Sequence, residues 1–270
     1  MGIPAVVAES GGEHVLIVRL DDADRARTEL ARFISENRGW PPRPIVVPPV
    51  SPGVGAALIY ASLLVILYMA SRQGSYGFDW LQSGEANAEL IRHGAWWRTI
   101  TALSLHADVA HLIGNIVFGG LFGVMLAQAI GAGPAWFVFI AAGAAGNGLN
   151  AWWQSGSHLS IGASTGVFAL LGAQVACDQV RRSHVHVNTM RRWAPVILGV
   201  ALLAWLGGSG DRTTDRIDIS AHVFGFAVGL GAGALFGWRT LRRPLAVRTQ
   251  NAFTATALGA VVLAWVLAFR

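Results

Sequence analysis

Polar residues in this chain separate long apolar stretches, and their spacing predicts helices that cross a membrane. No charged residue occurs between Asp108 and Asp178, a gap of 69 residues. A spanning helix needs roughly 20 mainly apolar residues, so the gap has room for three of them. Similar stretches lie on both sides of it. The pattern predicts seven spans, at about 54–70, 109–130, 135–153, 159–177, 193–207, 219–238 and 250–269.

The first 50 residues follow a different pattern. The stretch "HVLIVRL" (14–20) predicts a strand, and residues 21–37 predict a helix, because acidic residues come early and apolar ones recur at helical spacing. The proline-rich "PPRPIVVPPVSP" indicates a linker. We therefore expect an all-α polytopic membrane protein, with a cytosolic N-terminal βα segment and linker at 1–50 and a transmembrane domain at 51–270.

Composition and charge agree with a membrane protein and set its orientation. Only 13% of the residues are charged, against about 25% in a typical soluble domain. All 20 basic residues are arginine, and many lie in the short loops 178–192 and 239–248. Loops rich in arginine stay on the cytoplasmic side, which predicts a cytoplasmic N-terminus and an external C-terminus. The same bias explains the net charge of +5 without a nucleic-acid partner.

Four polar residues inside the predicted spans are candidates for a functional site, because such residues are costly in a membrane and usually face the bundle interior. They are His111, Asn115, Ser164 and His222. All three spans that carry them run inward from the outer surface, and each residue lies within the first few positions of its span. The four residues therefore share a depth. His111 and Asn115 are four residues apart and share a helical face.

The spacing around His222 indicates how Ser164 is activated. Gly225 and Gly229 share a helical face with His222 and form a small-xxx-small pair, which lets a neighbouring backbone approach closely. Such an approach is required for a hydrogen bond of roughly 2.6–3.2 Å from His222 to Ser164. Histidine suits the task of taking the serine proton near pH 7. The Ser164 N–H, Asn115 and His111 are the candidate donors to an oxyanion.

Other interpretations of these residues are open at this point. The pentapeptide 162–166 matches the G-x-S-x-G elbow of soluble hydrolases, although no strand is predicted before it. Serine in a membrane helix is most often a packing residue, and an isolated histidine is often structural. Asp218 either caps the next helix, which is favoured, or completes a triad with His222. A transporter fits poorly, because the polar cluster lies toward one face and no paired broken helices are evident.

The ordered motifs resemble those of the rhomboid family of intramembrane serine proteases. They are Trp97-Arg98, His106, His111-x-x-x-Asn115, Gly162-x-Ser164 and Ala221-His222-x-x-Gly225-x-x-x-Gly229. The resemblance covers about 97–230 and implies a rhomboid-like helical bundle with a six-helix core plus a C-terminal helix. Residues 19–37 are similar to the end of the cytosolic domain that precedes the membrane core of some bacterial rhomboids. The resemblance to the family also implies a bacterial inner membrane protein with its active site toward the outer face.

The resemblance assigns roles to the candidate residues. It implies a dyad of Ser164 as nucleophile and His222 as general base, without a third acidic member. It implies an oxyanion site formed by His111, Asn115 and the Ser164 amide, next to Gly162, with no metal and no cofactor. Its expected partners are the lipid bilayer and single-span membrane proteins, which are cut in or near the transmembrane segment. No oligomeric state is predicted.

One departure from the family pattern and one alternative accompany these assignments. Thr165 follows the serine where the family most often has glycine. The alternative is a non-catalytic rhomboid-like protein that binds membrane segments without cutting them, although such relatives usually lack the serine or the histidine. The resemblance implies that spans two and five form the lateral path for substrate, which Trp205 and Leu206 of span five would border.

Several aromatic and histidine side chains are expected to lie away from the site. The tryptophans of the long 71–108 segment are typical of anchoring at the membrane interface. They are Trp80, Trp96 and Trp97. His93 and His158 are expected to be exposed. The "HVH" stretch at 184–186 lies in an arginine-rich loop and is expected to meet lipid headgroups rather than a metal.

Overall fold

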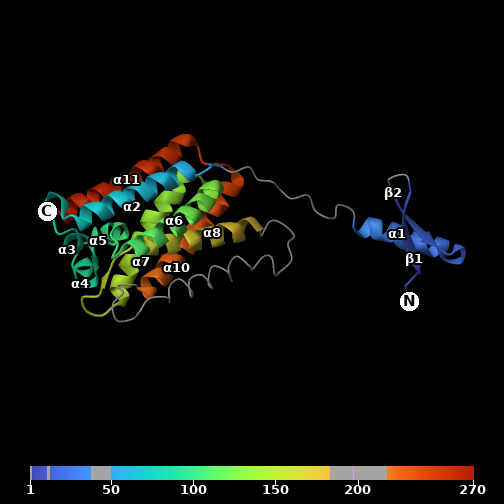
Figure 1. Cartoon of the computed structure of the whole chain (residues 1–270), viewed down its shortest axis with the longest axis horizontal. Coiled ribbons are helices and arrows are strands. Elements are labelled where there is room, and N and C mark those ends of the chain that lie inside the picture. Colours follow the sequence, from blue (N-terminus) through green and yellow to red (C-terminus); the bar gives the residue numbers. More distant parts are fainter. Residues whose placement is uncertain (1, 11–12, 38–49, 183–196, 198–217) are drawn as a thin grey trace. The chain divides into compact units, whose positions relative to one another are not determined.

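The computed structural model describes residues 2–10, 13–37, 50–182, 197 and 218–270 (Figure 1). By its internal contacts the chain divides into two compact units, Met1–Pro48 and Pro49–Arg270. In the first unit, strands β1 (Ala5–Ser10) and β2 (Glu13–Val18) form an antiparallel hairpin, and helix α1 (Ala23–Glu36) follows. The predicted strand and helix are present. Strand β1 is not predicted from the sequence, because "AVVAES" does not alternate between apolar and polar residues.

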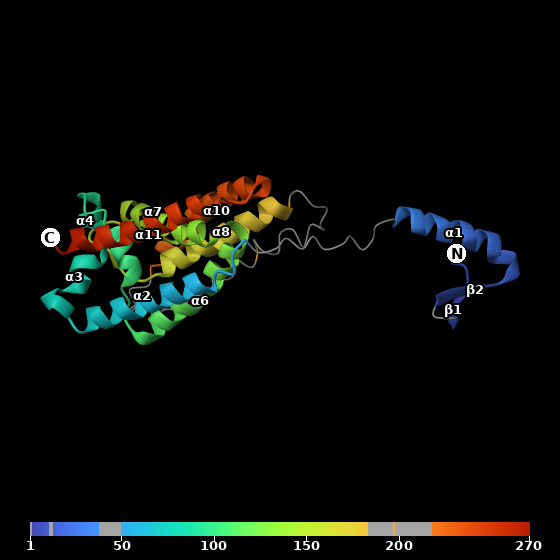
Figure 2. The same cartoon turned by 90° about the horizontal axis from the view of Figure 1, so that it is seen from above.

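The second unit is a bundle of long helices (Figures 1 and 2). They are α2 (Val54–Arg72), α6 (Val109–Ile130), α7 (Ala132–Trp153), α8 (Ser164–Arg182), α10 (Ile219–Arg242) and α11 (Val247–Ala268). Among the described residues, α2, α6, α10 and α11 are long and apolar enough to cross a membrane. The expectation of an all-α polytopic membrane protein is confirmed. The predicted span at 193–207 lies outside the described residues, apart from residue 197.

Short elements fold the segment between α2 and α6 onto the bundle. They are α3 (Trp80–Gly84), β3 (Ala86–Asn87), α4 (Ala88–Arg92) and α5 (Arg98–Thr101). Strand β3 pairs antiparallel with β4 (Leu159–Ser160), which lies just before α8. The Arg98 guanidinium donates to the carbonyl oxygens of Glu85 and Gln82, each at 2.9 Å. This arginine therefore fixes the segment by bonds to its backbone.

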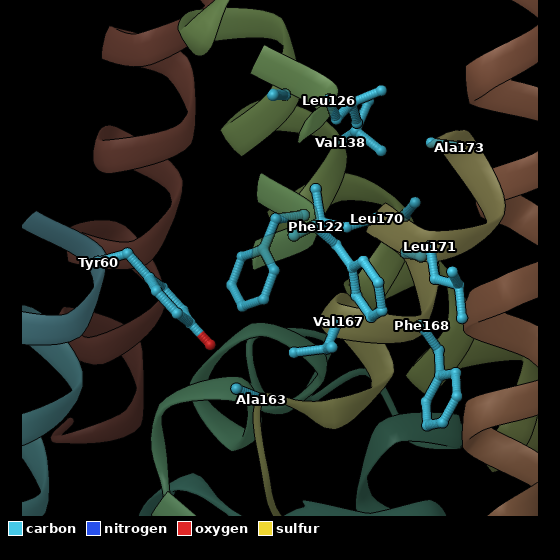
Figure 3. Packing of buried hydrophobic residues seen from close by; sticks show 14 of the residues in the cluster. Tyr60, Phe122, Leu126, Val138, Ala163, Val167, Phe168, Leu170, Leu171 and Ala173 are labelled. Atoms are coloured by element: carbon cyan, nitrogen blue, oxygen red, sulfur yellow. The ribbon is translucent and has the colours of Figure 1, made fainter. Parts of the chain in front are cut away.

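Helix α8 lies at the centre of the bundle, where it contacts α6, α7 and α10. The side chains of Val167, Phe168, Leu170 and Leu171 are at most 5% exposed. Figure 3 shows these residues of α8 near Phe122 of α6, with core residues of neighbouring helices around them. Since α8 starts at Ser164, the central position of this helix also fixes the candidate nucleophile.

Glycines bring α10 against α8. They recur every fourth residue along α10, at Gly225, Gly229, Gly233 and Gly237. A Cβ at Gly229 would overlap the Ala169 carbonyl oxygen, and one at Gly233 would overlap that of Ala173. Small residues allow this approach of two membrane helices. The expected role of Gly225 and Gly229 is confirmed, and the row extends for two further turns.

Candidate active site

The structure places Ser164 and His222 within hydrogen-bond distance. Ser164 is the first residue of α8, and His222 is the fourth residue of α10. Between the two side chains, His222 Nε2 lies 2.7 Å from Ser164 Oγ. The histidine is 4% exposed. A neutral imidazole nitrogen at this distance is able to accept the hydroxyl proton.

Gly162 gives the turn before Ser164 its shape. Its φ angle is +130°, a region that residues with a side chain rarely adopt. The Gly162 N–H donates to the Ala102 carbonyl oxygen at 2.9 Å. A Cβ on Gly162 would lie 2.6 Å from His111 Nε2 and 3.5 Å from Ser164 Oγ. Glycine is therefore required both by the backbone and by the imidazole of His111 packed against it.

The start of α8 leaves an amide donor next to the serine hydroxyl. The first helical N–H groups have no carbonyl partner within the helix. The bond from Val167 N–H to the Ala163 carbonyl oxygen, at 3.0 Å, opens the helical ladder after Ser164. The N-terminal end of a helix also carries a partial positive charge. The Ser164 N–H thus belongs to a region that favours a negatively charged oxygen.

His111 and Asn115 lie on the first two turns of α6. The Asp108 carboxylate caps this helix by accepting the His111 backbone N–H at 2.8 Å. Asn115 Nδ2 donates to the His111 carbonyl oxygen at 3.1 Å, and the Tyr60 hydroxyl donates to the Asn115 carbonyl oxygen at 2.8 Å. The structure therefore brings His111 to Gly162, whereas the Asn115 amide bonds to its own helix with one of its two hydrogens.

His106 lies beside His111, with ring centroids 5.1 Å apart. It is 2% exposed, in the segment between α5 and α6. Burial, aided by the neighbouring His111, lowers the pKa of His106 to about 3. His106 is thus neutral near pH 7 and adds no positive charge beside His111.

The His222 ring packs against α8. The Phe168 ring, one turn after Ser164, has its centroid 4.6 Å from that of His222. Among the described residues, His222 Nδ1 has no hydrogen-bond partner. This arrangement agrees with a pair of residues rather than a triad.

Asp218 has other partners. Its carboxylate accepts from the Ser220 hydroxyl at 2.6 Å, the Ala221 N–H at 3.2 Å, the Asn150 amide, and His158 Nε2 at 2.8 Å. Burial alone would raise the pKa of Asp218, but these hydrogen bonds and the nearby His158 together lower it. Asp218 therefore caps α10 and joins it to the end of α7 and to the loop before Ser164.

The site has room for water. A cavity of about 10 Å³, close to the minimum for one water molecule, adjoins the Ser164–His222 pair. Asn147, Ser160 and Thr165 are among the residues that line it. The cavity therefore has space for about one water molecule beside the serine hydroxyl.

Thr165 fits where the family most often has glycine. It is 3% exposed. Its Cγ2 occupies the space left by two glycines, since a Cβ on Gly146 or Gly225 would lie 2.8 or 2.9 Å from that methyl group. The Ser164–His222 distance of 2.7 Å is reached with threonine in this position.

The structure differs from the sequence analysis at two side chains. Trp80 is 7% exposed and packs against Trp265 of α11, so it is a core residue rather than an interfacial one. The His158 side chain is only 36% exposed, because it is held by Asp218. His93 is exposed, as expected. Residues 184–186, Trp205 and Leu206 lie outside the described residues.

Three further residues at or near the site are not predicted from the sequence. Phe168 lies one helical turn from Ser164, so helical spacing would have found it. Asn150 is a polar residue within a predicted span, the same signal that singled out Asn115. Trp265 gives no such signal, because it is 161 residues from its bonding partner Ser104.

Helices long and apolar enough to cross a membrane, among them the helix α10 that carries His222, define an integral membrane protein. A model of the Rhomboid domain matches residues 93–239, more than half of the 270 residues. The chain therefore belongs to the rhomboid family.

Curated relatives carry the family name. The chain is 28% identical over 162 residues to RHOMBOID-like protein 5 of Arabidopsis thaliana, covering 60% of this chain and 49% of that protein. It is 28% identical over 180 residues to Rhomboid protease GluP of Bacillus subtilis (strain 168), covering 66% and 34%. It is 31% identical over 183 residues to RHOMBOID-like protein 7 of Arabidopsis thaliana, covering 62% and 56%. The match thus spans about a third to just over half of these relatives.

Proposed function

We propose that this chain is an intramembrane serine endopeptidase that cuts single-span membrane proteins in or near their transmembrane segment. The observation that carries the proposal is the 2.7 Å distance between His222 Nε2 and Ser164 Oγ. Helices α8 and α10 supply the two residues and are packed through a row of glycines. Membership in the rhomboid family and similarity to a protein named rhomboid protease support the same activity.

The proposed chemistry follows from the pair. His222 takes the hydroxyl proton as Ser164 Oγ attacks the carbonyl carbon of the peptide bond. The negative charge that develops on the carbonyl oxygen is stabilised by the Ser164 N–H, His111 and a hydrogen of the Asn115 amide. His222 then gives the proton to the leaving amine, and an acyl-enzyme forms. Water activated by His222 releases the second product and restores the serine.

The proposed location is a bacterial inner membrane for the domain 51–270, with the N-terminus and the segment 1–50 in the cytoplasm. The arginine-rich loops support the orientation, and the resemblance to bacterial rhomboids supports the membrane. Ser164, His222, His111 and Asn115 all lie near the N-terminal ends of their helices. With the orientation derived from charge, those ends face the outer surface. Gly162 would shape the turn there.

Cleavage by the reconstituted protein tests the proposal. The full chain is placed in liposomes with a panel of single-span membrane proteins, and products are followed by gel and mass spectrometry. We expect Ser164→Ala and His222→Ala to lower the cleavage rate by about 10⁴-fold or more, because the nucleophile and its base act as a unit. Ser155→Ala is the matched control, since Ser155 is exposed in the loop before α8.

The outcomes separate an enzyme from a binding protein. Cleavage by wild type and Ser155→Ala but not by the two site variants supports the proposal, provided that all four proteins insert equally. Equal cleavage by Ser164→Ala refutes the assigned nucleophile. Binding of the panel by wild type without cleavage favours the non-catalytic alternative.

A further inference from the structure

The C-terminal helix ends against the segments that support the candidate site. Figures 1 and 2 show the C-terminus beside α3, and α11 contacts both α3 and α5. Trp265 lies one turn before the end of α11 and is 7% exposed. It belongs to a buried cluster, here named the Trp265 cluster, whose other members are Trp80, Leu105 and Ile161.

Trp265 is fixed in this cluster by rings and by a hydrogen bond. Its ring centroid lies 4.8 Å from that of Trp80 and 5.1 Å from that of Phe269. Its indole N–H donates to Ser104 Oγ at 3.2 Å. A Cβ on Gly84 would lie 2.6 Å from the Trp265 ring, so a larger residue there would displace the ring or the backbone of Gly84. The indole thus has packing on its faces and a polar bond at its edge.

The other two members of the Trp265 cluster adjoin the site in sequence. Leu105 is fully buried and directly precedes His106, which packs on His111. Ile161 is 6% exposed and directly precedes Gly162, against which the His111 ring lies. The Trp265 cluster therefore joins α11 to one residue from each of the two segments that meet at His111.

Hydrogen bonds connect the same two segments. Ser104 accepts the Trp265 N–H and donates to the Thr101 carbonyl oxygen at 2.7 Å. The carbonyl oxygen of the next residue, Ala102, accepts the Gly162 N–H at 2.9 Å. Removal of the indole would leave a cavity beside Leu105 and Ile161, and neighbouring groups relax into such cavities. Both segments would then move relative to α8.

We propose that Trp265 is a positioning residue that holds the Ser104–Leu105 and Ile161–Gly162 segments so that His111 and the turn before Ser164 keep their catalytic geometry. The C-terminal helix is on this view part of the site's support rather than an added membrane anchor. The inference rests on the proposed peptidase function. Rigid aromatic rings suit the role, because they cover a large area with few rotatable bonds.

The test compares two aromatic residues of the same helix. Trp265→Ala removes the indole near the site. Phe253→Ala is the matched control, because Phe253 packs in the other half of α11, with ring centroids 4.9 Å from Phe137 and 5.4 Å from Phe236. Val266→Ala is a second control, which measures the effect of shortening a 47% exposed side chain next to Trp265 on α11. Each full-length protein is assayed for kcat, KM, thermal unfolding and the rate of Ser164 labelling by a small fluorophosphonate.

We expect Trp265→Ala to lower kcat and the labelling rate by about 10- to 100-fold with little change in KM, as for a misplaced catalytic group. Phe253→Ala should lose comparable thermal stability yet stay within about twofold of wild-type kcat while folded. Trp265→Phe keeps a ring but loses the N–H, so an intermediate loss of about threefold is expected. If Trp265→Ala does not fold, Trp265→Phe tests the positioning role in its place.

Three results would overturn the inference. The first is a Trp265→Ala protein whose labelling rate and kcat equal those of wild type. If the alanine variant is unfolded, the same result in Trp265→Phe counts instead. Another is an equal loss of kcat in Trp265→Ala and Phe253→Ala at equal stability. The third is a rise in KM without a fall in labelling. A wild-type protein that neither cuts nor labels refutes the proposed function instead, so the two failures are distinguishable.

Discussion

Two contacts hold the candidate site, and they are built from opposite kinds of residue. Where α10 meets α8, a row of glycines on α10 brings the backbones of the two helices into contact, as at Gly229 and Gly233. Where α11 meets the 79–105 and 161–162 segments, large aromatic rings fill the space. The first contact sets how near His222 comes to Ser164. The second adjoins the segments around His111 and Gly162.

The two contacts should therefore respond differently to substitutions. A backbone-on-backbone contact has no side chain that can move away, so even one added methyl group must separate the helices. When a ring is removed from an aromatic cluster, the neighbouring side chains relax partly into the cavity, and the helices of the bundle stay packed. We therefore expect variants of the glycine row to unfold the protein, and variants of the cluster to impair chemistry first.

The largest effect is expected at Gly229. Gly229→Ala places a methyl group against the Ala169 carbonyl oxygen. We expect a loss of about 3 kcal/mol or more in the free energy of unfolding, measured in detergent, together with loss of fluorophosphonate labelling. Gly231→Ala is the matched control, since a Cβ there has nothing within 4 Å. Equal stability of the two variants would contradict the contact described for α8 and α10.

The next effect is expected at Gly162. Alanine there meets both an unfavourable φ angle and the His111 ring. We expect Gly162→Ala to lower kcat by about 100-fold while the fold is retained, because the turn before Ser164 shifts. Gly114→Ala, on α6 with open space around its Cβ, should keep wild-type kcat. A Gly162→Ala protein as active as wild type would show that this turn is not critical.

A smaller effect is expected at Asp218, which caps α10. Asp218→Asn weakens bonds to Asn150 and His158, and we expect a loss of about 1–3 kcal/mol at pH 7. Because the pKa of Asp218 is lowered by folding, its stabilisation is fully present above about pH 4 and fades as the pH falls through its folded pKa. Thermal unfolding of both proteins at pH 7 and pH 3 measures this.

The stability gap between wild type and Asp218→Asn should therefore narrow at pH 3. Asp79→Asn is the control, because Asp79 caps α3 through an exposed bond to the Gln82 N–H. We expect that variant to show a smaller gap at pH 7. A gap at Asp218 that does not change with pH would refute a role for its charge.

Sequence alone predicted much of this architecture, because membrane spans are set by local composition. The helices α2, α6, α10 and α11 begin within three residues of their predicted spans. The pairing of Ser164 with His222 was also expected, because the costly polar groups share a depth and Gly225 and Gly229 allow close approach. Their catalytic roles stay predictions.

Other features depend on contacts that no local pattern contains. Trp80 was expected at the membrane interface, since its sequence neighbourhood does not include Trp265, its partner in the fold. His158 was expected to be exposed, because Asp218 lies 60 residues away. The bond from Asn115 Nδ2 to the His111 carbonyl oxygen likewise depends on a rotamer choice that spacing leaves open.

Labelling of Ser164 by a fluorophosphonate tests the central claim most directly, because the probe reacts with an activated serine and needs no substrate. Wild-type protein in liposomes is treated with the probe, and the modified residue is identified by mass spectrometry. We expect labelling at Ser164, and a fall of about 100-fold or more in its rate in His222→Ala. Failure of folded wild-type protein to label, or an unchanged rate in His222→Ala, would contradict the serine–histidine pair.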